Sequence, residues 1–251
     1  MSSETDATLA SWLPTAFILA TALATALGGL ILTARARWDT ARLHYFVALG
    51  AGFMLAAAIL RMIPVSAEMV SSAPLLILAG YLLIHFVEHT AVRHFHFGEE
   101  THPEHTGLGV GVAALIGLSI HSFFDGISIA AGFLIDPTLG VLLFVAIVLH
   151  KAPEGFTIAS IMLAAGRSRL EAQLAAIIVG AATILGALAV VPFQGRAGEA
   201  LAFGAGVTLY VAASDLIPEV NRSEGAAVAI MVFAGVVLYY ATEALLGLLG
   251  M

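Results

Sequence analysis

Cysteine is absent from the 251 residues of the chain. This excludes disulfide bonds and thiolate metal ligands, so any metal site must be built from histidine, carboxylate, methionine or backbone oxygen. Charged side chains are also scarce, at 11% of the residues, and the formal net charge is −7. Because nucleic acid is bound by basic surfaces, a nucleic-acid partner is not expected.

In place of charge, the chain has long apolar stretches. Hydrophobic residues make up 60% of it, and its mean hydropathy is +1.00, far above that of an average soluble domain. Roughly 20 apolar residues in a helix cross the ~30 Å hydrocarbon core of a bilayer. We therefore predict an all-α integral membrane protein, a single transmembrane domain over residues 1–251. Its eight expected helices lie at about 12–34, 43–63, 74–94, 107–134, 139–165, 171–192, 199–219 and 225–249.

Arginine in short loops indicates which side of the membrane faces the cytoplasm. With the N-terminus outside, the outer side holds Arg61 and Arg196, and the inner side receives Arg35, Arg37, Arg42, Arg93, Arg167, Arg169 and Arg222. Both termini are therefore expected to be extracytoplasmic in a cell (inner) membrane, and residues 95–106 form a cytoplasmic loop. The acidic start has no basic region before its apolar stretch, so we expect no cleaved signal peptide.

Two segments far apart in the chain resemble each other. Residues 50–64, GAGFMLAAAILRMIP, and residues 204–218, GAGVTLYVAASDLIP, share GAG at one end and Ile-Pro at the other. The match continues into the helix that follows each segment. It predicts an inverted-topology repeat, in which helices 1–3 correspond to helices 6–8 around the central helices 4 and 5. The alternative is convergence, since small residues recur where transmembrane helices pack closely.

Helices 4 and 5 also resemble each other, and they carry potential metal ligands near the middle of the membrane. HSFFDGISIA (121–130) and HKAPEGFTIA (150–159) both have an acid four residues after histidine, followed by glycine. Residues four apart lie on one helix face, so His121 with Asp125 and His150 with Glu154 form two-ligand edges. Facing edges supply two imidazoles and two carboxylates, which suit Zn²⁺ and tolerate Fe²⁺, Mn²⁺ or Cd²⁺.

Several interpretations of this pair of motifs remain open. Charged groups at the bilayer centre cost at least ~2.5 kcal/mol each unless they pair, bind an ion or line water, so two copies favour a function. One alternative is a structural hydrogen bond within each helix. Another is a zinc-dependent membrane hydrolase, although HExxH is absent. A third is a membrane protein that senses metal without transporting it.

Together, these features resemble the Zrt/Irt-like (ZIP) family of metal transporters, in its prokaryotic type. The resemblance rests on His-x-x-x-Asp-Gly in helix 4, His-x-x-Pro-Glu-Gly in helix 5 and LYVAASDLIPE in helix 7, and it covers essentially the whole chain. It implies transport of a divalent transition metal, zinc first, toward the cytoplasm by an elevator-like movement. The implied protein is a homodimer in the lipid bilayer, with metal ions as partners, no enzymatic activity and no organic cofactor.

The resemblance also implies the ligands. The family's primary metal site corresponds to His121, Asp125, His150 and Glu154. Met54 matches a position where some bacterial members offer a thioether, although a methionine that fills the core is an equal alternative.

A second metal site of the family is incomplete in this chain. The positions that would supply its carboxylate or amide ligands hold Ser122, Lys151 and Thr183. Because Asp125 and Glu154 remain, we expect the Lys151 ammonium to be a tethered cation at the second-metal position. The chain would then carry one ion at a time through a single midplane site.

Other polar residues lie toward helix ends. By the same resemblance, possible pathway residues toward the inner exit are Asp215, Glu219 and Glu243, although Glu243 lies toward the outer end of its helix. Arg61 stands where the family often has histidine, and we expect it to pair with Glu68 or a lipid phosphate. The histidine-bearing loop suits weak metal capture, or is simply a hydrated polar segment. Its histidines are His89, His94, His96, His102 and His105.

Overall fold

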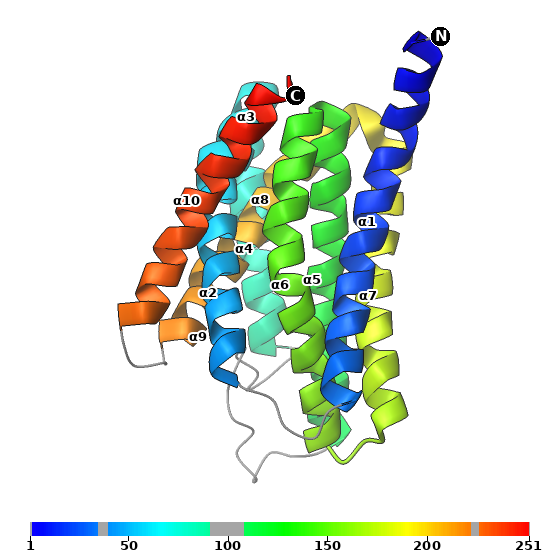
Figure 1. The fold of residues 1–251 in the computed structure, drawn as a ribbon, viewed down its shortest axis with the longest axis vertical. Helices are drawn as coiled ribbons and strands as arrows, with labels where there is room; N and C mark the ends of the chain where they lie inside the picture. The colour runs from blue at the N-terminus through cyan, green and yellow to red at the C-terminus, as the bar shows by residue number, and fades with distance from the viewer. Residues whose placement is uncertain (1, 35–39, 91–107, 222–225, 251) are drawn as a thin grey trace.

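The computed structural model describes residues 2–34, 40–90, 108–221 and 226–250, and within these ranges the chain is helical, with no β-strand. The prediction of an all-α protein is confirmed for this part of the chain. The long helices lie side by side along the long axis of the molecule (Figure 1). The elements are α1 (Ser2–Ala34), α2 (Thr40–Ala57), η1 (Ala58–Met62), α3 (Ile63–Met69), α4 (Ala73–Thr90), α5 (Leu108–Ile135), α6 (Pro137–Ala164), α7 (Arg169–Val190), η3 (Val191–Arg196), α8 (Ala197–Tyr210), η4 (Val211–Leu216), α9 (Ile217–Asn221) and α10 (Ala226–Leu248).

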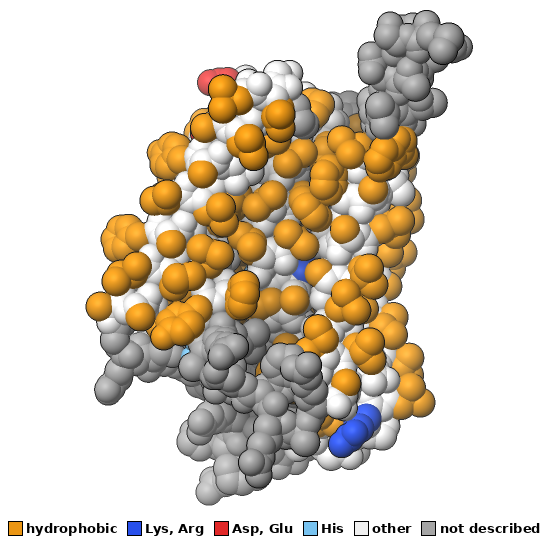
Figure 2. All heavy atoms as spheres, viewed as in Figure 1, with side chains coloured by type: hydrophobic (Ala, Val, Ile, Leu, Met, Phe, Trp, Pro, Cys, Tyr) orange, Lys and Arg blue, Asp and Glu red, His pale blue; other side chains and the backbone are white. Residues whose placement is uncertain are grey.

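Seven segments of the described chain are long and apolar enough to cross a membrane. Hydrophobic side chains cover the middle of the face in Figure 2, as expected for contact with lipid. The longest segment, Arg169–Leu216, has 48 residues and covers the predicted stretch 171–192 and most of the predicted stretch 199–219. It is interrupted in η3, where Phe193 has non-helical dihedral angles (φ −117°, ψ 31°) and the chain turns back (Figure 1). The chain is an integral membrane protein.

The ends of α6 follow directly from its sequence. Asp136 accepts a hydrogen bond from the Leu139 backbone N–H at 2.9 Å, and Pro137 occupies the first turn, where no donor is needed. Beyond the other end, Gly166 adopts a positive φ of 78°, which glycine adopts without steric cost. These caps fix the register of the helix that carries the second metal motif.

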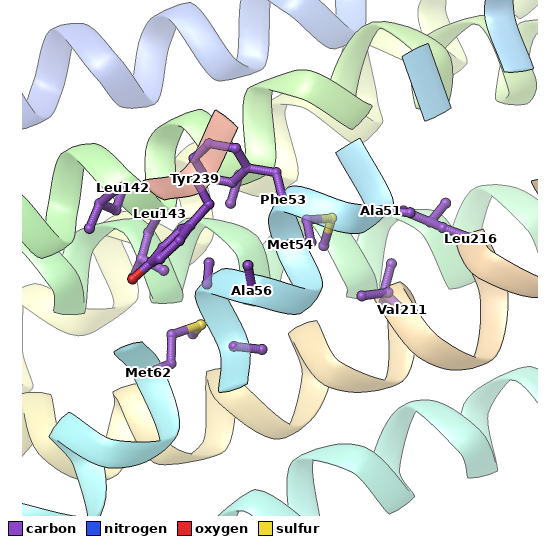
Figure 3. Close-up of a cluster of buried hydrophobic side chains, with 14 of the residues drawn as sticks. Ala51, Phe53, Met54, Ala56, Met62, Leu142, Leu143, Val211, Leu216 and Tyr239 are labelled. Atoms are coloured by element: carbon purple, nitrogen blue, oxygen red, sulfur yellow. The ribbon is translucent and has the colours of Figure 1, made fainter. Parts of the chain in front are cut away.

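Two groups of helices pack around different hydrophobic clusters. In the first group, α1, α5, α6 and α7 contact one another, and Ile158 on α6 packs in a cluster with α5 and α7. In the second group, α2 packs along α10 and α4 along α8. Figure 3 shows the larger cluster, where Phe53, Met62 and Tyr239 of the second group meet Leu142 of α6. The first half of α6 therefore packs across the boundary between the groups.

Close helix approaches occur at matched glycines in the second group. At each of them, a Cβ atom would overlap a backbone carbonyl oxygen of the facing helix, so only glycine permits the contact. Between α2 and α10 these contacts join Gly52 with Val232 and Gly235 with Leu49. Between α8 and α4 they join Gly206 with Ile77 and Gly80 with Phe203.

Two short π-helical segments interrupt otherwise regular helices. η1 follows α2 and η4 follows α8, and in each case a helix with proline in its first turn comes next, with Pro64 and Pro218 respectively. A π-helical turn is rare and frequently marks a functional region. Arg61 lies in η1 and Asp215 lies in η4.

Candidate metal centre

The two central helices bring the four predicted ligands together. One ligand atom from each of His121 and Asp125 on α5, and His150 and Glu154 on α6, lies within 4.8 Å of the other three. Asp125 Oδ2 is 3.1 Å from His121 Nε2 and 3.4 Å from His150 Nε2. The two Nε2 atoms are 3.3 Å apart. In the part of the chain that the structure describes, no other set of three or more such side chains is assembled in this way.

The cluster is shielded from the lipid by neighbouring helices. Its four side chains have exposed fractions of 6%, 1%, 2% and 0% in chain order. A glycine follows each acid and lets an outer helix approach: a Cβ on Gly126 would overlap the Thr183 carbonyl oxygen of α7, and one on Gly155 that of Thr25 on α1. The glycine of each motif thus explains how α1 and α7 cover the site.

Lys151 places its ammonium among the carboxylates of the cluster. Its Nζ is 2.7 Å from Asp125 Oδ2, contacts Glu154 Oε2, and donates to Ser122 Oγ at 2.6 Å. The Ser122 hydroxyl in turn donates to Glu154 Oε1 at 2.7 Å. The lysine side chain is fully buried, so it does not reach for the membrane surface. A buried cation is stable only when it is paired in this way.

Some buried polar atoms at the site have no hydrogen-bond partner among the described residues. They are His121 Nδ1, Asp125 Oδ1 and Thr183 Oγ1. Such atoms are uncommon in folded proteins and call for an explanation in each case. His150 differs, because its Nδ1 lies 3.3 Å from the Ala146 carbonyl oxygen, an interaction that orients the ring and directs Nε2 toward the cluster.

A second acidic group lies between α4 and η4, apart from the four-residue cluster. The Tyr210 hydroxyl donates to Glu88 Oε2 at 3.0 Å, and Glu88 also interacts with Asp215. The hydroxyls of Tyr81 and Ser214 are 2.8 Å apart in the same region. The sequence pointed to Asp215 as a pathway residue, but the partnership with Tyr210 was missed because no local spacing connects these residues.

Arg61 does not pair with Glu68, one of the two partners expected for it from the sequence. Its Nη2 lies 3.9 Å from Asp136 Oδ1. Asp136 is the N-cap of α6, and the start of this helix lies beside Arg61. Sequence spacing alone could not predict this ion pair. Glu243 lies apart from the metal cluster and accepts a hydrogen bond from the Tyr239 hydroxyl at 3.5 Å.

The remaining predicted residues fall outside the cluster or outside the described residues. Met54 is fully buried in the hydrophobic cluster of Figure 3, as a core-filling methionine would be. His89 is exposed at the end of α4, where its Nδ1 is 2.8 Å from the His85 carbonyl oxygen. Those outside the described residues are the side chain of Glu219 and the loop residues His94, His96, His102 and His105.

Residues 98–243 match a family model described as ZIP zinc transporter. "Zinc transporter ZIP9" of Micropogonias undulatus is 31% identical over 159 residues, which covers 57% of this chain and 49% of the relative. ZIP9 of Macaca fascicularis is 36% identical over 121 residues, 42% of this chain and 50% of the relative. "Zinc transporter ZIP13 homolog" of Drosophila melanogaster is 31% identical over 121 residues, 45% and 34% of the two chains. The chain thus matches about half the length of its ZIP9 relatives.

Proposed function

Because the chain belongs to the ZIP zinc transporter family, we propose that it moves a divalent transition metal across the membrane toward the cytoplasm, with zinc as the first candidate. Iron, manganese and cadmium ions are alternative substrates, since imidazole and carboxylate ligands also accept them. The family consists of transporters, so the hydrolase alternative is set aside. The proposed protein is a homodimer in a cell membrane with both termini outside.

The proposed metal site comprises His121, Asp125, His150 and Glu154. The observation that carries it is the convergence of their ligand atoms within 4.8 Å in a buried cluster. Two imidazole nitrogens and two carboxylate oxygens complete a four-ligand set for zinc.

A single ion is proposed to bind, because the Lys151 ammonium occupies the position of the family's second metal ion. Its ammonium already touches both carboxylates that a second ion would share, Asp125 and Glu154. A second divalent ion would have to displace this tethered cation and would meet no carboxylate from Ser122 or Thr183. Coulomb repulsion between the ammonium and an adjacent divalent ion also disfavours double occupancy.

We further propose eight membrane crossings. A continuous helix of the 48 residues in Arg169–Leu216 would be about 72 Å long, more than twice the ~30 Å hydrocarbon core. The break in η3 supports two crossings, α7 and α8.

The inverted repeat is proposed with support from the packing. If Gly52 is aligned with Gly206, the residues that they contact, Val232 and Ile77, are aligned as well. The same alignment makes η1 correspond to η4. The correspondence extends to the other four helices, with α1 matched to α7 and α6 to α5. In these helices the contact of Gly28 with Ala152 corresponds to that of Gly186 with Phe123. Likewise, the contact of Gly155 with Thr25 corresponds to that of Gly126 with Thr183.

An elevator-type movement fits the two helix groups. The proposed moving bundle is α1, α5, α6 and α7, which contains all four ligands, and the other group is the stationary scaffold. In the present arrangement Leu139, Leu142 and Leu143 of α6 are buried against the scaffold. With the N-terminus outside, this packing closes the outer half of the path.

The proposed route to the cytoplasm leads past Asp215 and Glu88. Two neighbouring carboxylates, with the Tyr210 hydroxyl beside them, attract a divalent cation that leaves the midplane. Glu219 follows one helical turn later, and the His-bearing loop at residues 95–106 is proposed to receive the ion.

Uptake into proteoliposomes tests the site. In His150→Ala, loss of one imidazole ligand should lower the initial rate of zinc uptake by at least about tenfold. The matched control is Ser160→Ala on the same helix, which removes a hydroxyl bonded only to the Phe156 carbonyl oxygen and should leave uptake unchanged. Unaltered uptake by His150→Ala would overturn the proposed site.

Metal stoichiometry tests the single-ion proposal separately. Wild type should bind one zinc per chain at α5 and α6, and Lys151→Asp, which supplies a carboxylate in place of the cation, should bind two. Calorimetric titration with zinc measures both numbers. Binding of two ions by wild type would contradict the single-ion proposal but not the proposal that the protein transports metal.

A further inference from the structure

A cavity outside the metal path lies where the two helix groups meet. It has a volume of about 320 Å³ and lies between α5, the end of α7, η3 and the start of α8. This volume is at the lower end of the range for small-molecule sites, roughly 300–1,000 Å³. The cavity belongs to neither the four-residue metal cluster nor the acidic group near η4.

The wall of the cavity is apolar and partly aromatic. Phe124 and Ile127 line it from α5, and Phe203 from α8. The rings of Phe124 and Phe203 are 5.1 Å apart and join the two sides. Phe193 completes the wall from η3 and is 62% exposed, so the cavity opens toward the lipid. An alkyl chain fits such a wall, whereas an ion or a polar solute does not.

Two residues of opposite charge are among those that line this cavity. Arg196 and Glu199 both line it, three residues apart at the junction of η3 and α8. Neither has a hydrogen bond or ion pair with any part of the chain that the structure describes. Because η3 interrupts the 48-residue apolar segment at its turn, these charges lie at a membrane boundary, the depth of phospholipid headgroups.

We infer that this cavity binds one membrane phospholipid with a phosphoethanolamine headgroup. The Arg196 guanidinium pairs with the phosphate, since its planar donors match phosphate oxygens. The Glu199 carboxylate accepts hydrogen bonds from the primary ammonium. An acyl chain lies along Phe124, Ile127 and Phe203. The lipid therefore lies between α5, which carries His121 and Asp125, and α8 of the other helix group.

The charge pattern selects among headgroups. A phosphoglycerol headgroup has no ammonium for Glu199 and adds net negative charge beside it. A phosphocholine headgroup has a quaternary nitrogen, which cannot donate a hydrogen bond to the carboxylate. Free phosphate or a headgroup without acyl chains lacks the apolar part that fills the cavity.

Native mass spectrometry of the full chain, purified from an equal mixture of the three phospholipids, tests this inference. Wild type should retain one phosphatidylethanolamine per chain in preference to the other two. Arg196→Gln should reduce retention roughly fivefold, as expected for one lost arginine–lipid charge contact. Glu199→Gln should remove the preference over phosphatidylcholine.

Cavity filling provides the second arm. Ala189→Trp places a large side chain in the cavity and should abolish retention. The matched control is Leu245→Trp, on the exposed face of α10, which should retain the lipid. Glycerophosphoethanolamine, a headgroup without acyl chains, should not displace it. Retention by Ala189→Trp equal to wild type, equal retention of all three lipids by wild type, or displacement by the free headgroup would each overturn the inference.

Discussion

Matched positions in the two halves of the chain carry different charges. Ser122 on α5 corresponds to Lys151 on α6, and Arg61 in η1 corresponds to Asp215 in η4. The glycine contacts around these positions are alike in the two halves. Packing is therefore kept between the halves, whereas charge is not. The two ends of the proposed path are therefore unequal for a divalent cation: the arginine repels the cation, whereas the aspartate offers it a carboxyl ligand.

Lys151→Met removes the charge difference between positions 122 and 151. Of the changes considered, we expect this one to have the largest effect on stability. In this variant the buried carboxylates of Asp125 and Glu154 lose their cation. Because removing one partner of a buried ion pair costs about 3–5 kcal/mol, we expect the unfolding free energy to fall by that amount. Thermal unfolding of the detergent-purified protein with a chelator present measures the loss. Zinc should restore more stability to this variant than to wild type.

The double variant Lys151→Met with Glu154→Gln is the control, because it removes a cation and an anion together. It should be more stable than Lys151→Met alone in the absence of metal. An unfolding temperature of Lys151→Met equal to that of wild type would show that the ammonium is not the counter-charge of the carboxylates.

Gly52→Ala and Gly206→Ala test whether the packing of the halves is matched. In each variant the new Cβ meets a carbonyl oxygen of the facing helix, so each should lose about 1–3 kcal/mol, and the two losses should be similar. Gly195→Ala is the control, since nothing lies within 4 Å of its added Cβ. Unfolding measurements that show a loss in only one of the two variants would contradict the correspondence between α2 and α8.

Asp215→Asn and Arg61→Gln compare the two ends, with the smallest expected effects. Replacing the Asp215 carboxyl group by an amide should slow zinc uptake by roughly fivefold, which corresponds to ~1 kcal/mol. Arg61→Gln should change the unfolding free energy by less than about 1 kcal/mol, because the pair with Asp136 is 3.9 Å long and both side chains are more than a third exposed, Arg61 at 34% and Asp136 at 44%. Faster uptake in Arg61→Gln would agree with repulsion at that end, whereas an uptake loss larger than that of Asp215→Asn would reverse the comparison.

Features that depend on spacing along one helix could be predicted from the sequence. The four-residue spacing in each motif placed His121 with Asp125 and His150 with Glu154, and the structure brings both pairs together. Whether they hold metal stays a prediction. The family assignment is confirmed by the comparisons, because its motifs are local sequence patterns.

Features that depend on contacts between distant segments could not be predicted in this way. The pairing of Arg61 with Asp136 follows from how α6 begins beside η1, and the pairing of Tyr210 with Glu88 follows from α4 packing along α8. The π-helical form of η1 and η4 also has no signal in apolar periodicity. The hydrogen bond from Lys151 to Ser122 joins α6 to α5, so the sequence of one helix could not predict it. The sequence predicted only that the ammonium lies near the carboxylates.

In the proposed transport cycle, the ammonium of Lys151 also has a consequence for the return of the protein without a bound ion. The formal charges of Asp125, Glu154 and Lys151 sum to −1 when no ion is bound and to +1 with a divalent ion. The Born cost of holding charge in a low-dielectric medium depends on the square of that charge, so the empty and loaded forms bear similar costs. Without the lysine, the empty form would carry a double charge and the loaded form none. In the proposed elevator movement, the lysine thereby makes the electrostatic work similar in the two directions.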